Sequence, residues 1–227
     1  MYWQDEKQER VATPPDDVVD LVFSIACRTL PVDHAYALSQ AVLGVLPWLA
    51  DEASAGVHTI HVAESGNGWM RPDQSDALLY LSRRTKLVLR LPTRRVDDAR
   101  RLSGCTLDVA GNELRVEDAS VRQLSLNSAV FARYIVSDEG IDENAFLEQV
   151  VAALGAMGIR PMKLLCGIER VIATPERRLH TRSLMVADLT PGESVTLQQR
   201  GLGPLRHLGC GLFIAHKDVK EVRDTLD

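Results

Sequence analysis

The sequence of 227 residues predicts an α+β fold in which two ferredoxin-like (RRM-like) halves, each with the element order βαββαβ, follow one another. Three observations carry this prediction. Short apolar runs with the two-residue period of half-buried strands alternate with runs of helical period. The same order of elements occurs twice, and a glycine-rich loop lies near the C-terminus.

The first half is expected to span residues 16–124, after a polar N-terminal arm of residues 1–15. Val18–Cys27 alternates apolar side chains between two faces and predicts a strand. Asp33 is a candidate N-cap for a helix that continues to Leu46, where apolar residues recur at helical spacing.

A pair of strands joined by a short polar turn follows this helix. Ala77–Leu81 and Lys86–Leu91 are expected to pair with each other as a hairpin. A short helix is expected at Val96–Leu102, and a second hairpin, Thr106–Val109 with Glu113–Val116, completes the half.

The second half is expected to span residues 125–227 and repeats this order. Its strands are expected at Ala129–Val136, Lys163–Ala173, Ser183–Leu189 and Leu212–Ala215. Asp142 is expected to cap a helix with one apolar face, and Gly158 to end it. Ser194–Gln199 is interpreted as a short segment before the glycine-rich loop.

Composition excludes several classes of protein. Hydrophobic residues make up 45% of the chain, enough for cores without disulfide or metal staples. The four cysteines form no Cys-x-x-Cys pair, so we interpret them as reduced packing residues of a cytoplasmic protein and expect no metal site and no cofactor. No apolar run approaches the ~20 residues of a membrane span, and the polar N-terminus is unlike a signal peptide.

Charge is distributed unevenly along the chain. The net charge of -5 argues against an indiscriminate nucleic-acid binder. However, Ser82–Arg101 has eight Arg or Lys against two acids, a sum of +6, and Arg160–Arg206 has eight against four, a sum of +4. A local basic face on an acidic protein suits one structured polyanion; ordinary solvated faces are the alternative.

The glycine-rich loop contains two Gly-x-Gly pairs around a basic insert. Glycine allows positive φ angles and the close approach of a phosphate or of another backbone. The alternative interpretation is a turn that leads into a buried strand. With the basic hairpin 82–95 and the basic insert 176–182, the loop is expected to form one surface for phosphate contacts and a folded RNA stem. The candidate RNA-binding residues are Arg83, Arg84, Lys86, Arg177, Arg178, Arg182, Gly201, Gly203, Arg206, His207, Gly209 and Gly211.

His34 is the candidate acid–base residue. It lies at the first turn of the first predicted helix, where the helix dipole favours a neutral imidazole, although Asp33 opposes this effect. A helix-terminal histidine without catalytic duty is the alternative. His180 and His207 are candidate phosphate contacts because both lie in basic segments. The remaining histidines are interpreted as structural or surface residues: His58, His61 and His216.

Three stretches, Gly201–Phe213, Leu81–Pro92 and Leu30–His34, resemble motifs of the CRISPR-associated repeat-RNA endoribonucleases, the Cas-six family. The resemblance extends over nearly the whole chain after about residue 16. The glycine-rich loop also lies where the family has it. A single glycine loop is common, but one at the end of a tandem ferredoxin-like chain is not.

This resemblance implies metal-independent cleavage of precursor CRISPR RNA within each repeat. A neutral histidine takes the proton of a ribose 2′-OH, which attacks in line and leaves a 2′,3′-cyclic phosphate and a 5′-hydroxyl. In many members this histidine is at or near the first helix, which points to His34. Tyr36 and Ser39 are weaker candidates. Cationic stabilisation of the phosphate is expected from Arg206, Arg177 or Lys86.

The partners implied are the stem-loop of CRISPR repeat RNA, the mature crRNA and other Cas proteins of an interference complex, with no direct contact to DNA. Two other functions remain open. One is a non-catalytic subunit that holds repeat RNA in a ribonucleoprotein, and the other is a small-molecule module whose glycine-rich loop binds a phosphate.

Overall fold

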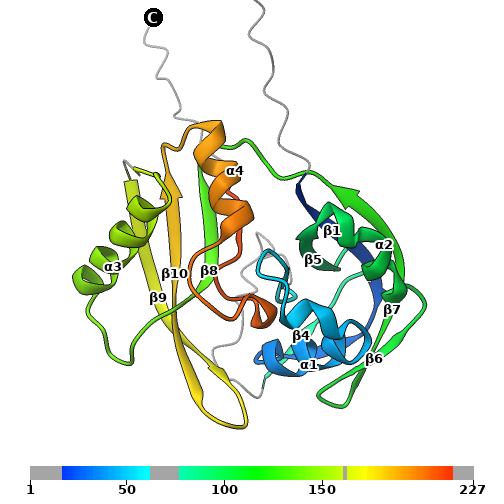
Figure 1. Cartoon of the computed structure of the whole chain (residues 1–227). Coiled ribbons are helices and arrows are strands. Elements are labelled where there is room, and N and C mark those ends of the chain that lie inside the picture. Colours follow the sequence, from blue (N-terminus) through cyan, green and yellow to red (C-terminus); the bar gives the residue numbers. More distant parts are fainter. Residues whose placement is uncertain (1–16, 62–76, 161–162, 217–227) are drawn as a thin grey trace, which may run out of the picture.

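The computed structural model describes residues 17–61, 77–160 and 163–216, and it shows two large antiparallel sheets with helices packed on them and a separate two-stranded ribbon (Figure 1). The tandem ferredoxin-like α+β fold predicted from the sequence is confirmed. The predicted arm of residues 1–15 lies outside the described residues. Within these ranges, no helix combines the length and the apolar character needed to cross a membrane.

The first sheet comes from the first half of the chain. Its strands are β1 (Val18–Ala26), β3 (Gly56–Val57), β5 (Lys86–Pro92), β6 (Thr106–Val109) and β7 (Asn112–Arg122). Their order is β3-β5-β1-β7-β6, with antiparallel neighbours. The helical elements are α1 (Ala35–Val45), η1 (Pro47–Ala50), η2 (Thr93–Arg95), α2 (Val96–Ala99) and η3 (Arg100–Leu102).

The second sheet comes from the second half. Its elements are β8 (Val130–Val136), α3 (Glu143–Ala156), β9 (Lys163–Ala173), β10 (Arg178–Ala187), α4 (Pro191–Arg200), the 3₁₀ turn η4 (Arg206–Leu208) and β11 (Phe213–Ala215). The strand order is β11-β8-β10-β9. In both halves the opening strand, β1 or β8, lies between the closing strand and the third strand of the βαββαβ unit, so the two halves share one topology.

Local sequence signals explain several of these elements. Asp142 caps α3 by accepting hydrogen bonds from the amides of Asn144 and Ala145 at 2.9 and 3.1 Å. Gly158, with φ of 79°, follows the last turn of α3. The hairpin of β6 and β7 is also present as predicted.

The predicted hairpin of Ala77–Leu81 with Lys86–Leu91 is wrong. The turn between them forms, since the amide of Thr85 donates to the carbonyl of Ser82 at 3.0 Å. Beyond the turn the strands separate: β4 (Leu78–Tyr80) pairs with β2 (Thr29–Pro31), whereas β5 pairs with β1 and β3. Both edges of β5 are therefore occupied, and β4 needs a different partner.

Two helix starts also differ from the prediction. Asp33 does not cap α1, whose N-cap residue is His34; instead its carboxylate accepts a hydrogen bond from the amide of Ala173 at 2.8 Å. The stretch expected as a short segment is the ten-residue helix α4. Its signal was present in the sequence, because Thr190 and Glu193 form a capping box with Pro191 in the first turn.

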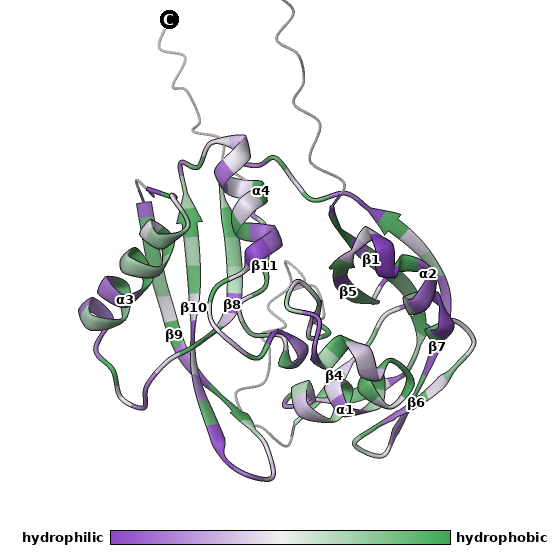
Figure 2. Ribbon diagram, viewed as in Figure 1, coloured by the Kyte–Doolittle hydropathy of each residue, from purple (hydrophilic) through white to green (hydrophobic). Residues whose placement is uncertain are grey.

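Each sheet has its own apolar core, and two smaller clusters join the halves. Side chains of β1 such as Leu21 and Phe23 form the first core with α1 and β5, and Phe146 and Val150 of α3 pack in the second. The third cluster joins Ala35 of α1 to residues of the second half. Figure 2 shows the hydrophilic stretches at the far end of the β9–β10 hairpin and at η4.

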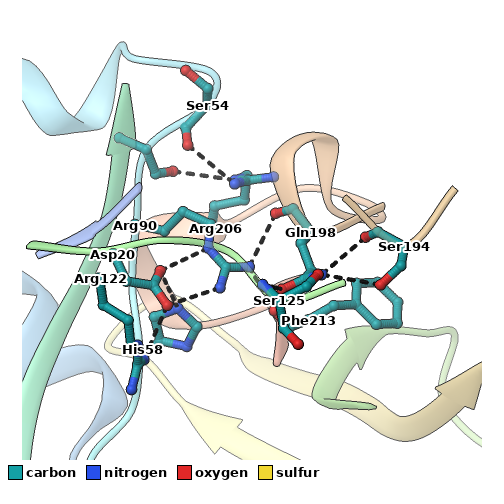
Figure 3. A network of polar contacts seen from close by, with 11 residues as sticks. Asp20, Ser54, His58, Arg90, Arg122, Ser125, Ser194, Gln198, Arg206 and Phe213 are labelled. Carbon is teal, nitrogen blue, oxygen red and sulfur yellow. Dashed lines mark hydrogen bonds and ion pairs between the residues drawn. The ribbon is translucent and has the colours of Figure 1, made fainter. Parts of the chain in front are cut away.

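A buried ion pair of the first half is hydrogen-bonded to the second half through its arginine (Figure 3). Arg90 of β5 is 1% exposed; its Nε lies 2.9 Å from Oδ1 of Asp20, and its Nη2 lies 3.2 Å from Oδ2. Nη1 of the same guanidinium donates to the backbone carbonyls of Gln198 and Phe213 in the second half. Burial alone would raise the pKa of Asp20, but Arg90 and His58 more than offset it and hold that pKa well below its usual range.

The glycine-rich loop packs inside this interface between the halves. All four of its paired glycines have positive φ, from 66° to 85°. The amide of Leu202 donates to the carbonyl of Gly211, and a Cβ on Gly211 would meet the backbone of Leu202. The amides of Gly201, Gly209 and Gly211 donate to the carbonyls of Leu197, Arg206 and Tyr134. These three amides are therefore used within the protein.

We expect Arg90→Ala to lower the free energy of unfolding by roughly 3–5 kcal/mol, because it leaves the Asp20 carboxylate buried without its partner. Urea unfolding at neutral pH measures this. Arg84→Ala, which removes an exposed arginine, is the control and should change stability by less than ~0.5 kcal/mol. A small effect of Arg90→Ala would contradict the structural role of the pair.

The same pair predicts a dependence on pH. Because the folded-state pKa of Asp20 is depressed, its contribution is fully present above the ordinary carboxylate pKa of 3.8 and is lost as the pH falls below that value. Asp20→Asn should remove this part of the acid destabilisation. If Asp20→Asn loses stability in acid as steeply as the unmodified chain, Asp20 is not the responsible group.

A pair of glycine variants tests the packing of the loop. Gly203→Ala places a Cβ in open space and should cost about 1–2 kcal/mol, the penalty of a left-handed backbone. Gly211→Ala adds a clash with the backbone of Leu202 to the same penalty, so its unfolding free energy should fall further. Equal losses in urea unfolding would show that the close contact is unimportant.

Candidate nucleic-acid interface

The N-terminal end of α1 is where segments from distant parts of the chain meet, and we call it the α1 junction. The β2 strand leads into it, and Asp33 contacts the turn end of the β9–β10 hairpin by accepting a hydrogen bond from the amide of Ala173. The buried side chains of the junction are Ala35, Tyr134, Ile172, Leu179, Leu208 and Cys210. Both halves of the molecule therefore contribute to it.

His34 is at the centre of the α1 junction and is 1% exposed. Its Nδ1 lies 2.8 Å from the carbonyl oxygen of Pro31, and its Nε2 accepts a hydrogen bond from the amide of Ile60 at 3.0 Å. This pattern assigns the proton to Nδ1 and a lone pair to Nε2, so the ring is neutral. Before Nε2 could act as a base, its hydrogen bond from the amide of Ile60 would have to break. The catalytic role of His34 thus stays a prediction.

The two weaker catalytic candidates, three residues apart on α1, differ in burial. Tyr36 is half-buried and packs against the apolar cluster of the α1 junction. Ser39 is fully buried, and its hydroxyl has no hydrogen-bond partner among the described residues. Ser39, like His34, is enclosed in the free protein, and its catalytic role stays a prediction.

His61 also belongs to this site, although the sequence alone predicts only a structural role for it. It follows Ile60, is half-buried, and its Nε2 lies 2.7 Å from the hydroxyl of Thr59. Its ring stacks on Tyr134 with centroids 6.3 Å apart. The carbonyl of Tyr134 in turn accepts the amide of Gly211, so His61 is linked to the glycine-rich loop. No local sequence pattern predicts the contact between these two rings.

The basic insert of the glycine-rich loop points largely inward. Arg206 is 8% exposed, and its guanidinium donates to the carbonyls of Ser54 and Ala55 at 3.1 and 3.2 Å (Figure 3). Burial lowers its pKa to about 10, still far above neutrality. Because its guanidinium is used within the protein, its placement does not support the expected RNA contact. His207 is half-buried, and burial lowers the pKa of its imidazole, which favours the neutral ring.

The other basic candidates differ in whether their side chains are hydrogen-bonded within the protein. Arg83 and Arg84 are exposed in the turn before β5, and Arg177 and Arg178 are exposed at the end of the β9–β10 hairpin. Two further candidates are bonded within the protein. The ammonium of Lys86 donates to the hydroxyl of Ser24, and Arg182 donates to the carbonyl of Ile141.

His180 is bonded within the protein as well. Its Nδ1 lies 2.8 Å from Oε1 of Glu169, so the side chain is not held as a phosphate contact in this conformation. Residues 17–61, 77–160 and 163–216 contain no group of three or more His, Cys, Asp or Glu side chains placed to hold a metal ion.

Comparison with known proteins gives consistent results. The family model described as Cas6 Crispr matches residues 19–218. A Myxococcus xanthus (strain DK1622) protein named CRISPR-associated endonuclease Cas6 is 31% identical over 196 residues, which cover 86% of this chain and 80% of the relative.

Solved structures support the fold. A Cas6-related protein from Pyrococcus furiosus superposes with a TM-score of 0.59 at 11% identity, covering 90% of this chain and 99% of the other. A protein described as a RAMP protein binding different RNA substrates gives a TM-score of 0.57 at 14% identity, with 88% and 100% coverage.

Proposed function

Because this chain belongs to the Cas6 family of CRISPR-associated proteins, we propose that it is an endoribonuclease that binds CRISPR repeat RNA and cuts it to give mature crRNA. The observation that carries the proposal is the relative named as an endonuclease, which is 31% identical over most of both chains. The exposed arginines that flank the α1 junction add support, because phosphate groups are recognised mainly by Arg and Lys.

We propose a reaction that needs no metal ion. A histidine takes the proton of the ribose 2′-OH, the oxygen attacks the adjacent phosphorus in line, and the bond to the 5′-oxygen breaks. The products are a 2′,3′-cyclic phosphate and a 5′-hydroxyl, whose oxygen receives a proton. General acid–base catalysis of this kind contributes roughly 10²–10⁴-fold to the rate.

His34 is the proposed base. Its neutral ring already has the lone pair on Nε2, which is the tautomer that proton abstraction by this atom requires. When RNA binds, Nε2 would exchange the amide of Ile60 for the 2′-hydroxyl. His207 and His61 are the histidines nearby in the fold that would replace it if this exchange does not occur.

A cleavage assay with a labelled stem-loop repeat in EDTA tests both the reaction and its base. The unmodified protein should produce a 2′,3′-cyclic phosphate, and His34→Ala should cut about 10²–10⁴-fold more slowly while binding the repeat with similar affinity. His61→Ala and His207→Ala are the matched variants. Since His34 is buried, urea unfolding must show that His34→Ala remains folded under the assay conditions.

Several outcomes would contradict parts of this proposal. Tight binding without cleavage by the unmodified protein would favour a non-catalytic repeat-RNA-binding subunit. Unimpaired cleavage by folded His34→Ala would transfer the role of base to His207 or His61. A loss of cleavage in EDTA that returns with a divalent cation would exclude the metal-independent reaction.

The exposed arginines of the β9–β10 hairpin give a separate prediction. Arg177→Ala combined with Arg178→Ala should weaken repeat binding and reduce the slope of log Kd against log salt by roughly 0.7–0.9 for each phosphate that the variant no longer neutralises. Fluorescence anisotropy at several salt concentrations measures both. Arg100→Ala with Arg101→Ala removes the same charge from η3 and is the control. Equal effects of the two pairs would mean that only net charge matters.

A further inference from the structure

The two-stranded ribbon of β2 and β4 stands apart from both sheets. Its register pairs Thr29 with Tyr80, Leu30 with Leu79 and Pro31 with Leu78. Leu30 and Leu79 are buried, so this side of the ribbon faces the protein. The opposite side presents Tyr80 and Leu78 to solvent.

Tyr80 is 72% exposed, and Leu78 beside it is 42% exposed. Tyrosine usually covers its ring with protein atoms, because the ring contributes a large apolar area. No packing in the described residues explains the exposed ring, and the strand pairing fixes its direction. The ribbon therefore presents the ring of Tyr80 to solvent.

Three exposed arginines accompany this ring. Arg83 and Arg84 lie in the turn that follows β4, and this turn is closed by bonds between Ser82 and Thr85. Arg28 precedes β2, and its carbonyl accepts the amide of Leu81 at 2.9 Å, which places its backbone beside the end of β4. Within the part of the chain that the structure describes, none of the three forms an ion pair.

We propose that the β2–β4 ribbon binds an unpaired segment of the substrate RNA, with one base stacked on Tyr80 and neighbouring phosphates held by Arg28, Arg83 and Arg84. Base stacking on an aromatic ring needs only a π-face, and positive side chains beside the ring follow the phosphates of a single strand. An apolar protein surface would be a poor partner for the ribbon, because it would bury the charges of these arginines without acidic partners. This inference rests on the proposed function.

The position of the ribbon connects this binding site to the α1 junction. The amide of Val32, directly after β2, donates to the carbonyl of Ala77, directly before β4. His34 follows two residues later in the sequence. A strand held at Tyr80 would therefore lie beside the element that leads into α1, where cleavage is proposed.

Binding measurements with two RNAs test the ribbon. One RNA contains the repeat stem-loop with its single-stranded flanks, and the other contains the stem-loop alone. Tyr80→Ala should weaken binding of the flanked RNA by about 5- to 150-fold, the range for loss of one stacked base, and should leave binding of the bare stem-loop unchanged. Tyr80→Phe should bind as the unmodified protein does, because it keeps the ring.

Abasic nucleotides in the flank provide a second arm. At one flank position, an abasic nucleotide should weaken RNA binding by the unmodified protein as much as Tyr80→Ala does. The same abasic nucleotide should not weaken RNA binding by Tyr80→Ala any further. Leu165→Ala is the matched control, since it removes an exposed apolar side chain from β9, 59% exposed, away from the ribbon.

The outcomes separate this inference from the proposed function. If the unmodified protein cuts repeat RNA but Tyr80→Ala binds the flanked RNA normally, the stacking site is wrong and the nuclease stands. Equal weakening by Tyr80→Phe and Tyr80→Ala would also overturn stacking. If the unmodified protein neither binds nor cuts either RNA, the proposed function itself fails.

Discussion

The arrangement of the two halves depends on the charge of Arg90. This guanidinium leaves water completely, so the structure has to satisfy it from both sides of the interface. Asp20 on the neighbouring strand supplies the countercharge, and the carbonyls of Gln198 and Phe213 supply acceptors from the other half. Arg122 also reaches Asp20, at 3.0 Å. Because a half-satisfied buried charge costs several kcal/mol, other relative positions of the halves are disfavoured.

This constraint determines what the α1 junction can contain. With β5 fixed against α4 and β11, the glycine-rich loop fits against β3 only if its backbone approaches closely. A Cβ on Gly56 would contact Leu212 and the carbonyl of Arg206, and a Cβ on Gly209 would contact Thr59. The loop therefore contacts both Tyr134 and the segment before His61. These two rings stack close to the segment that holds His34.

The sequence predicted the features that local interactions decide. The alternation of β1, the cap of α3 at Asp142 and the β6–β7 hairpin depend on neighbours in the chain, so periodicity and turn chemistry were sufficient. Arg90 could not be recognised, because its partners lie 70, 108 and 123 residues away. The glycine pattern correctly indicated close approach, but a pattern does not say whether a phosphate or the protein's own backbone approaches.

His34 is buried, so it can act as a general base only if its Nε2 becomes available to the substrate. Releasing the amide of Ile60 from Nε2 leaves a donor without its partner, which costs about 1–3 kcal/mol if nothing replaces it. A general base contributes about 10²–10⁴ in rate, equivalent to roughly 3–5 kcal/mol of barrier. The exchange is therefore favourable if RNA supplies both new partners: its 2′-hydroxyl donates to Nε2, and a phosphate oxygen accepts from Ile60. Under the proposed function, the hydrogen bond from Ile60 would be a restraint that substrate binding removes, and it would preserve the required tautomer until that point.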